Sequence, residues 1–147
     1  MTQKIQTLLF SPEIHTREIV KLYLEEFGVY NLLSTVSDFE KAFLALKELD
    51  KSLMIIDISQ SEDNSFDFME KVSKEIPNCK IMVISDKPSV DLVIKAMRSG
   101  AREFVSLPLI KNDLFTSLSK ICDELNKGSK KISNKCKILS EIGRAHV

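Results

Sequence analysis

The fold is decided at residues 53–57, which read LMIID, and at residues 81–85, which read IMVIS. Each run places four consecutive apolar residues before one polar residue. Neither run shows the apolar–polar alternation of a strand that has one face in water, so both are typical of strands covered on both faces. The sequence therefore predicts two buried strands of a parallel sheet.

Strands and helices alternate on both sides of these two runs. Further strands are predicted at residues 4–10, 31–36 and 103–106, and the segments between strands have apolar residues at helical spacing. Five rounds of strand and then helix predict an α/β fold. Its expected architecture is a doubly wound, five-stranded parallel sheet with helices on both faces.

Capping signals predict several helix ends. Gly28 is placed to end the first helix in a left-handed conformation. Ser37, with Glu40 three residues later, predicts a capping box at the start of the second helix. The third helix is predicted over about residues 66–76, and Gly100 is predicted to end the fourth.

Composition excludes several classes of protein. The chain has 147 residues, 44% of them hydrophobic, which fits one domain with an apolar core. Its four glycines lie far apart in the sequence, so it contains neither a phosphate-binding P-loop nor a GxGxxG turn. No apolar run is long enough to span a membrane. The odd number and wide spacing of the three cysteines favour a cytoplasmic protein.

The formal net charge of zero conceals an asymmetry along the chain. Residues 1–125 carry 15 Lys and Arg against 20 Asp and Glu, whereas residues 126–147 carry six basic residues and one acid. The body of the protein is therefore mildly acidic and is followed by a basic tail. We expect the lysines of this tail to be solvated rather than bound to nucleic acid.

Functional residues of a parallel sheet of this kind are expected at the carboxyl ends of its strands, where the functional crevice lies. That rule selects Phe10 and Ser11 at the carboxyl end of the first strand and Asp57 at the end of the third. It also selects Ser85 at the end of the fourth strand and residues 106–108 after the fifth. These positions are the candidates for a binding or catalytic site.

Residues 4 to about 126 resemble a CheY-like receiver domain. The resemblance rests on Asp57 and Ser85 at two strand ends, on residues 96–104, which read AMRSGAREF, and on Pro108 shortly after the last strand. It implies a flavodoxin-like or CheY-like sheet with strand order 2-1-3-4-5.

The resemblance also sets a domain boundary and one backbone conformation. It implies a receiver-like domain over residues 1–126. It further implies a cis peptide bond between Leu107 and Pro108, which is plausible because cis bonds occur almost entirely before proline.

The same resemblance implies a phosphoacceptor pocket that has lost most of its chemistry. Receivers use two acidic residues to bind Mg²⁺ and a lysine to pair with the phosphoryl group. The matching positions are Leu9, Phe10 and Leu107, which offer neither side-chain oxygen ligands nor a positive charge. We therefore expect a pseudo-receiver that has no metal, no cofactor and no catalytic residue. Its degenerate pocket comprises Asp57 as the phosphoacceptor position, Ser85 as the phosphoryl-contacting hydroxyl, Leu9, Phe10, Leu107 and Pro108.

Plain structural roles remain open for the same residues. Asp57 can serve as an acceptor of backbone hydrogen bonds at a strand end, and Ser85 as a turn or cap residue. Leu9 and Phe10 can be additional core residues.

A switch and interaction face is implied on the fourth helix, fifth strand and fifth helix. Phe104 takes the aromatic position with which receivers report their state. The resemblance implies protein partners, and a possible homodimer, through this face. Its expected exposed cations would favour an acidic partner, and they are Lys95, Arg98, Arg102 and Lys111.

The end of the chain predicts the start of a second domain. Residues 127–134 have the composition of a basic linker, and residues 135–141 begin as a strand. Residues 142–147 match the translation of a common sequencing-library adapter, so we exclude them from the fold.

Receiver, linker and strand together resemble the start of a CpaE/TadZ-type pilus-assembly protein, in which an atypical receiver precedes a MinD/ParA-like ATPase. This resemblance implies a C-terminal ATPase domain in cis, which the receiver regulates or localises. The chain itself is not expected to be an enzyme, because the Gly-rich phosphate loop is absent. Two alternatives stay open: a phosphoacceptor receiver of a two-component phosphorelay, and a receiver followed by a DNA-binding helix-turn-helix domain.

Overall fold

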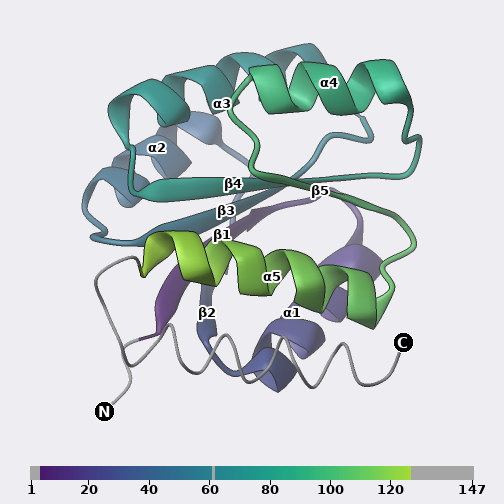
Figure 1. Ribbon diagram of the computed structural model, residues 1–147. Helices are drawn as coiled ribbons and strands as arrows, with labels where there is room; N and C mark the ends of the chain where they lie inside the picture. The colour runs from purple at the N-terminus through teal and green to yellow at the C-terminus, as the bar shows by residue number, and fades with distance from the viewer. Residues whose placement is uncertain (1–3, 61, 127–147) are drawn as a thin grey trace.

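Strand β3 (Ser52–Asp57) lies in the middle of a five-stranded parallel sheet whose order is β2-β1-β3-β4-β5 (Figure 1). This computed structural model describes residues 4–60 and 62–126. The predicted α/β class, strand number and strand order are confirmed. The other strands are β1 (Ile5–Phe10), β2 (Tyr30–Thr35), β4 (Cys79–Ser85) and β5 (Glu103–Ser106).

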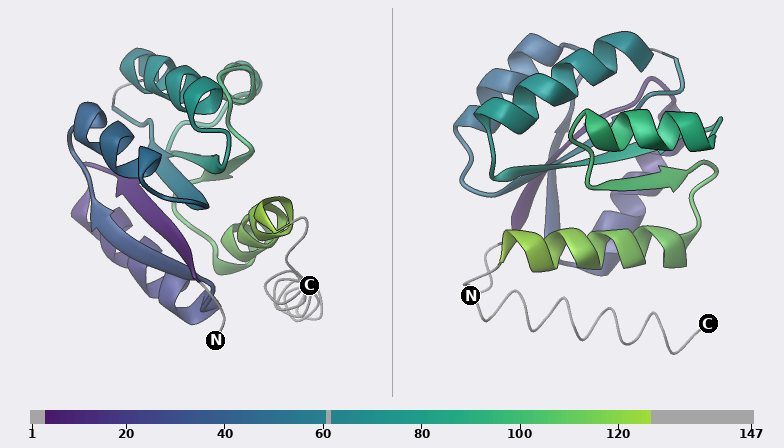
Figure 2. Two further views of the ribbon diagram at one scale, coloured as in Figure 1. Left: turned by 90° about the vertical axis from the view of Figure 1, so that its left-hand side faces the viewer. Right: turned by 45° about the horizontal axis from the view of Figure 1, so that its top comes forward.

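Helices cover both faces of the sheet, which Figure 2 shows nearly edge-on. One face carries α1 (Ile14–Phe27) and α5 (Lys111–Leu125). The other face carries α2 (Phe39–Lys47), α3 (Glu62–Glu75) and α4 (Val90–Arg98). Every residue of β3 is buried, as its unbroken apolar run predicts.

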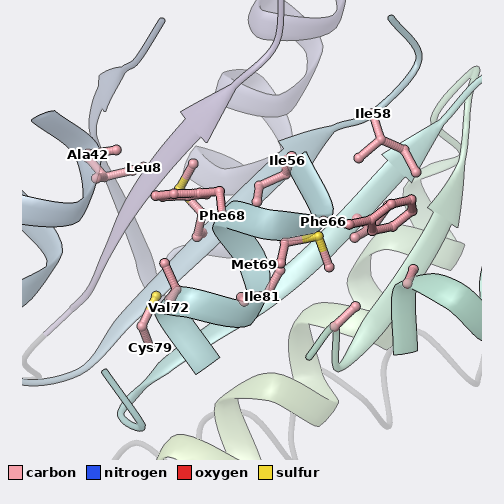
Figure 3. Packing of buried hydrophobic residues seen from close by; sticks show 14 of the residues in the cluster. Leu8, Ala42, Ile56, Ile58, Phe66, Phe68, Met69, Val72, Cys79 and Ile81 are labelled. Carbon is pink, nitrogen blue, oxygen red and sulfur yellow. The ribbon is translucent and has the colours of Figure 1, made fainter. Parts of the chain in front are cut away.

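Two hydrophobic cores form because successive side chains of a strand point to opposite faces. Leu53 and Ile55 of β3 pack with α1 and α5. Met54 and Ile56 pack on the other face, where Phe66, Met69 and Val72 of α3 meet Ile81 of β4 (Figure 3). The carboxyl ends of the strands are thereby fixed between two packed layers.

Two helix starts differ from the sequence prediction. Asp38, and not Ser37, is the N-cap of α2, because its side chain accepts hydrogen bonds from the backbone N–H groups of Glu40 and Lys41. Helix α3 begins at Glu62, before the predicted start at about residue 66. Its first turn is polar, so apolar periodicity could not detect it.

The predicted cis bond between Leu107 and Pro108 is confirmed. Within the described residues, no helix is both long enough and apolar enough to cross a membrane. The predicted linker at 127–134, the second-domain strand at 135–141 and the adapter at 142–147 lie outside the described residues.

The turn between α4 and β5 packs so closely against α3 that it requires a glycine at position 100. The backbone φ angle of Gly100 is +115°, a value that residues other than glycine rarely adopt. A Cβ atom at this position would lie 2.7 Å from the Cβ of Ser73. Gly28, at the end of α1, also has a positive φ, of +87°.

We predict that Gly100→Ala lowers the free energy of unfolding more than Gly28→Ala does. A left-handed backbone alone costs an ordinary residue about 1–2 kcal/mol, and the overlap with Ser73 adds to that cost at Gly100. Urea denaturation of the two variants measures the difference. Adding Ser73→Gly should recover part of the loss in Gly100→Ala, and equal losses in the two single variants would contradict the steric account.

Candidate functional site

Asp57 is the last residue of β3, at the carboxyl edge of the sheet, and it is only 2% exposed. The Ser11 hydroxyl donates to Asp57 Oδ2 at 2.9 Å, and the Ser59 backbone N–H donates to Oδ1 at 3.0 Å. Burying a carboxylate is costly unless hydrogen bonds compensate it. Both oxygens of this carboxylate are therefore engaged by the protein itself.

Ser11 is held in place from several directions. It is buried directly after β1, and its Oγ also accepts a hydrogen bond from the Glu13 N–H at 3.4 Å. Arg17 of α1 donates through Nη1 to the Ser11 carbonyl oxygen at 2.8 Å. The turn between β1 and α1 thus presents one hydroxyl to Asp57, and the nearby arginine is bonded to the backbone of that turn.

Leu9 and Phe10 do not lie where the predicted pocket put them. Leu9 is fully buried in the core under α1 and α5, and Phe10 packs on the other face against Phe39, with ring centroids 4.6 Å apart. Phe10 is in register with Ile56. One position further along both strands, Ser11 therefore comes beside Asp57.

Sequence reasoning placed Ser11 at the strand end but gave it no role in the pocket. The missing information was the register between β1 and β3, which decides the residue that faces Asp57. A count of strand ends along the sequence cannot supply that register. The first pocket position is therefore corrected from Leu9 and Phe10 to Ser11.

Ser85 ends β4 and is buried, but its hydroxyl belongs to a turn. The Ser85 Oγ accepts a hydrogen bond from the Lys87 N–H at 3.1 Å. In the same region the Ser59 Oγ accepts from the Asp86 N–H at 3.1 Å. The Asp86–Ser59 bond joins the loops after β3 and β4, whereas the Lys87–Ser85 bond is local to the turn after β4. The turn role that the sequence left open for Ser85 is therefore the one observed.

Leu107 and Pro108 follow β5 and do not extend the polar site. Leu107 donates its backbone N–H to the Ser85 carbonyl oxygen at 2.8 Å and packs its side chain against the core under α1 and α5. Pro108 is exposed. The side chain at position 107 therefore contributes apolar contact and no charge near Asp57.

The donors around Asp57 do not fit Mg²⁺, which takes oxygen ligands in near-octahedral geometry and is usually bound through carboxylates. A hollow of about 360 Å³ lies beside Ser11, and it is lined by hydroxyl, apolar and arginine side chains without a carboxylate. No cluster of three His, Cys, Asp or Glu suited to a metal occurs in residues 4–60 and 62–126. We therefore derive no step through a metal.

Most cations of the predicted interaction face are already paired within the chain. Lys95 Nζ lies 3.5 Å from an oxygen of Asp63, Arg102 Nη2 lies 2.7 Å from one of Glu124, and Lys111 Nζ lies 2.8 Å from one of Glu26. The bond to Glu26 raises the pKa of Lys111.

Arg98 is the exception among the predicted cations. It is exposed and has no ion pair among the described residues. The expected attraction to an acidic partner is therefore reduced to one free charge. Phe104 is half-buried and packs against the core under α2, α3 and α4.

Helix α4 presents an apolar surface that its sequence pattern did not identify as exposed. Val90, Ile94 and Met97 have helical spacing, yet their exposed fractions are 75%, 42% and 40%. The buried residues of α4 are Leu92 and Ala96. Apolar periodicity identifies a stripe, but it cannot tell whether that stripe faces the core or the solvent.

We predict that Ser11→Ala lowers the free energy of unfolding by about 1–3 kcal/mol, because a buried carboxylate oxygen loses its donor. Urea denaturation measures the loss. Thr116→Ala, which removes an exposed helical hydroxyl, should change stability by less than about 0.5 kcal/mol. In the background of Asp57→Ala the effect of Ser11→Ala should largely vanish, and full additivity would contradict the proposed coupling.

Comparison with known proteins supports the fold and identifies the family. The chemotaxis protein CheY of Thermotoga maritima is 30% identical over 116 residues, which is 79% of this chain and 96% of that protein. A putative NtrX-like response regulator of Rickettsia bellii is 21% identical over 137 residues, and the match spans 29% of its length.

Solved structures show the same architecture. A putative pilus assembly-related protein of Burkholderia pseudomallei superposes with a TM-score of 0.72 at 20% identity, over 82% of this chain and 91% of that one. A putative pilus assembly protein, CpaE, of Burkholderia thailandensis gives a TM-score of 0.70 at 23% identity, over 80% of this chain and 97% of that one. The sequence profile of the response regulator receiver domain matches residues 12–119. This chain therefore belongs to the response regulator receiver domain family.

Proposed function

We propose that this receiver domain is a pseudo-receiver, a non-catalytic module that acts through protein–protein contacts. One observation carries the proposal: Asp57 is buried, and a serine hydroxyl and a backbone amide each donate a hydrogen bond to one of its two oxygens. The carboxylate is thus engaged in holding β1 and β3 together at their carboxyl ends. A group in that structural role is poorly placed to act as a nucleophile.

Two described positions near Asp57 do not supply the free cation that phosphoryl transfer uses. Transfer to a carboxylate brings anionic groups together and is stabilised by cations placed where the charge develops. Leu107 offers no charge, and Arg17 is bonded to the Ser11 carbonyl. These features support a domain whose receiver fold is retained for its surfaces.

We further propose that the domain regulates or localises a CpaE/TadZ-type pilus-assembly ATPase from the cytoplasmic side. The two putative pilus-assembly proteins of Burkholderia share the fold of this domain, and this likeness of fold supports the proposal. The link to an ATPase in cis rests on the basic linker composition of residues 127–134 and on the sequence of residues 135–141, whose pattern predicts a strand. In this proposal the ATPase activity belongs to the rest of the protein.

The second candidate function is that of a phosphoacceptor receiver in a two-component phosphorelay. It is favoured by the retained Asp57 and Ser85 at the strand ends, and by the 30% identity to a CheY protein. The two functions differ in one measurable property, which is whether Asp57 becomes phosphorylated.

We predict that the chain gains no mass when it is incubated with acetyl phosphate and Mg²⁺ and analysed by intact mass spectrometry. The double variant Ser11→Asp, Leu107→Lys should gain one phosphoryl group, because it places a second carboxylate beside Asp57 and a cation after β5. Adding Asp57→Ala to that variant should abolish the gain. Phosphorylation of the unmodified chain that is lost in Asp57→Ala would overturn the pseudo-receiver and favour the phosphorelay.

The ATPase proposal makes a separate prediction about the native gene. Sequence read past the codon for Ser140 should encode a Gly-rich loop with its lysine within roughly a dozen codons, because such loops follow a buried strand directly. Amplification and sequencing from genomic DNA tests this. A helix-turn-helix sequence, or a native stop codon at this place, would contradict it.

A further inference from the structure

The hollow beside Ser11 has no part in the proposed function. It measures about 360 Å³ and lies between the turn after β1 and the loop after β2, so we call it the β1–β2 hollow. Residues 10–12 and Arg17 form one wall, and residues 35–37 form the other. Asp57, Ser85 and Leu107 do not line it, so this space is distinct from the degenerate phosphoacceptor pocket.

Backbone contacts fix the two walls of the β1–β2 hollow relative to each other. Leu9 is in register with Thr35, and the Val36 N–H donates to the Leu9 carbonyl oxygen at 2.7 Å. Phe10 of the first wall packs against Phe39 at the start of α2. The space is thus bounded by paired strand ends and is formed before any ligand arrives, as small-molecule sites usually are.

Arg17 brings a positive charge to this hollow. Its Nη1 donates to the Ser11 carbonyl oxygen at 2.8 Å, which holds the guanidinium in place but does not compensate its charge, because the carbonyl is neutral. Neither Asp57 nor any other carboxylate in the described part of the chain forms an ion pair with Arg17. Most N–H groups of the guanidinium fork therefore remain for a ligand, and the fork matches the oxygens of a phosphate group.

Hydroxyl groups lie on the opposite wall. Ser37 was predicted to cap α2, but Asp38 takes that role. Within residues 4–60 and 62–126 the hydroxyls of Ser37 and Thr35 have no hydrogen-bond partner, and both residues are exposed. A phosphate group bound to Arg17 would find further donors in these two hydroxyls.

Negative charges near the hollow are engaged elsewhere or lie in water. The described residues that line the space include no carboxylate. Asp38 uses its Oδ1 to cap α2, and Asp57 Oδ2 accepts the Ser11 hydroxyl. Glu13 is exposed, so solvent and salt screen its charge. The lining itself is therefore positively charged, through Arg17.

We propose that the β1–β2 hollow binds a nucleoside monophosphate. Arg17 holds the phosphate group, and the ring system lies against the apolar part of the lining, which consists of Phe10, Pro12 and Val36. A space of about 360 Å³ is within the range of small-molecule sites, and inorganic phosphate alone would leave most of it unfilled. The inference goes beyond the proposed function, because it adds a small ligand to a module that acts through protein contacts.

NMR titration of the isotope-labelled chain tests the site. The ligands are the 5′-monophosphates of adenosine, guanosine, cytidine and uridine. At least one of them should shift the amide signals of Ser11, Arg17 and Ser37 in a saturable way. The corresponding nucleoside and inorganic phosphate should each bind about tenfold or more weakly, because each lacks one half of the recognised group.

Matched variants separate the site from general charge effects. Arg17→Gln should raise the Kd of the nucleotide about tenfold or more, whereas Arg98→Gln removes an arginine on α4 that also lacks an ion pair among the described residues and should leave the Kd unchanged. Ser37→Ala should raise the Kd about threefold. Thermal unfolding followed by circular dichroism verifies folding, and Arg17→Lys, which keeps the charge without the fork, replaces Arg17→Gln if that variant does not fold.

Four outcomes would overturn the nucleotide site: no saturable shift with any of the four nucleotides, equal binding of inorganic phosphate, equal binding of the nucleoside, or an unchanged Kd in the folded Arg17 variant. Phosphorylation of Asp57 is read separately by mass spectrometry. Failure of this site and failure of the pseudo-receiver are therefore distinguishable.

Discussion

The Asp57 carboxylate lies almost entirely out of water at the end of a strand that helices cover on both faces, so the surrounding chain must supply its hydrogen-bond donors. Ser11 and Ser59 do so from the turns that follow β1 and β3. Further bonds from Arg17 to Ser11 and from Asp86 to Ser59 extend this connection to α1 and to the turn after β4. The carboxyl edge of the sheet is thus fixed by contacts that converge on one buried charge.

The fold of this domain and the chemistry that the same fold can support in its relatives depend on different residues. A receiver fold brings the strand ends together whether or not those ends carry metal ligands. Here β1 is followed by a serine and a proline, and β5 by a leucine and a proline. Membership of the family is therefore established by the match over residues 12–119, whereas the chemistry of a receiver depends on a few side chains at one edge.

Contacts within the chain also decide which surface side chains can attract a partner. Lys95 and Lys111 form ion pairs between neighbouring helices, and Arg102 forms one between the turn before β5 and α5. Because these cations are paired within the domain, their charge contributes little to attracting a partner. Val90, Ile94 and Met97 of α4 stay exposed to water instead. Recognition by this domain is for that reason expected to depend on apolar contact.

The sequence by itself determined the alternation of strands and helices, the two buried central strands and the conformations at Gly28 and Gly100, because periodicity and glycine are local signals. It also located Asp57 at a strand end. Only the tertiary structure decided that Ser11 and not Leu9 or Phe10 faces Asp57, because that depends on the register between two strands far apart in the chain. The tertiary structure likewise decided which cations are paired and which apolar stripe of α4 faces water. Both depend on neighbours that packing alone brings together.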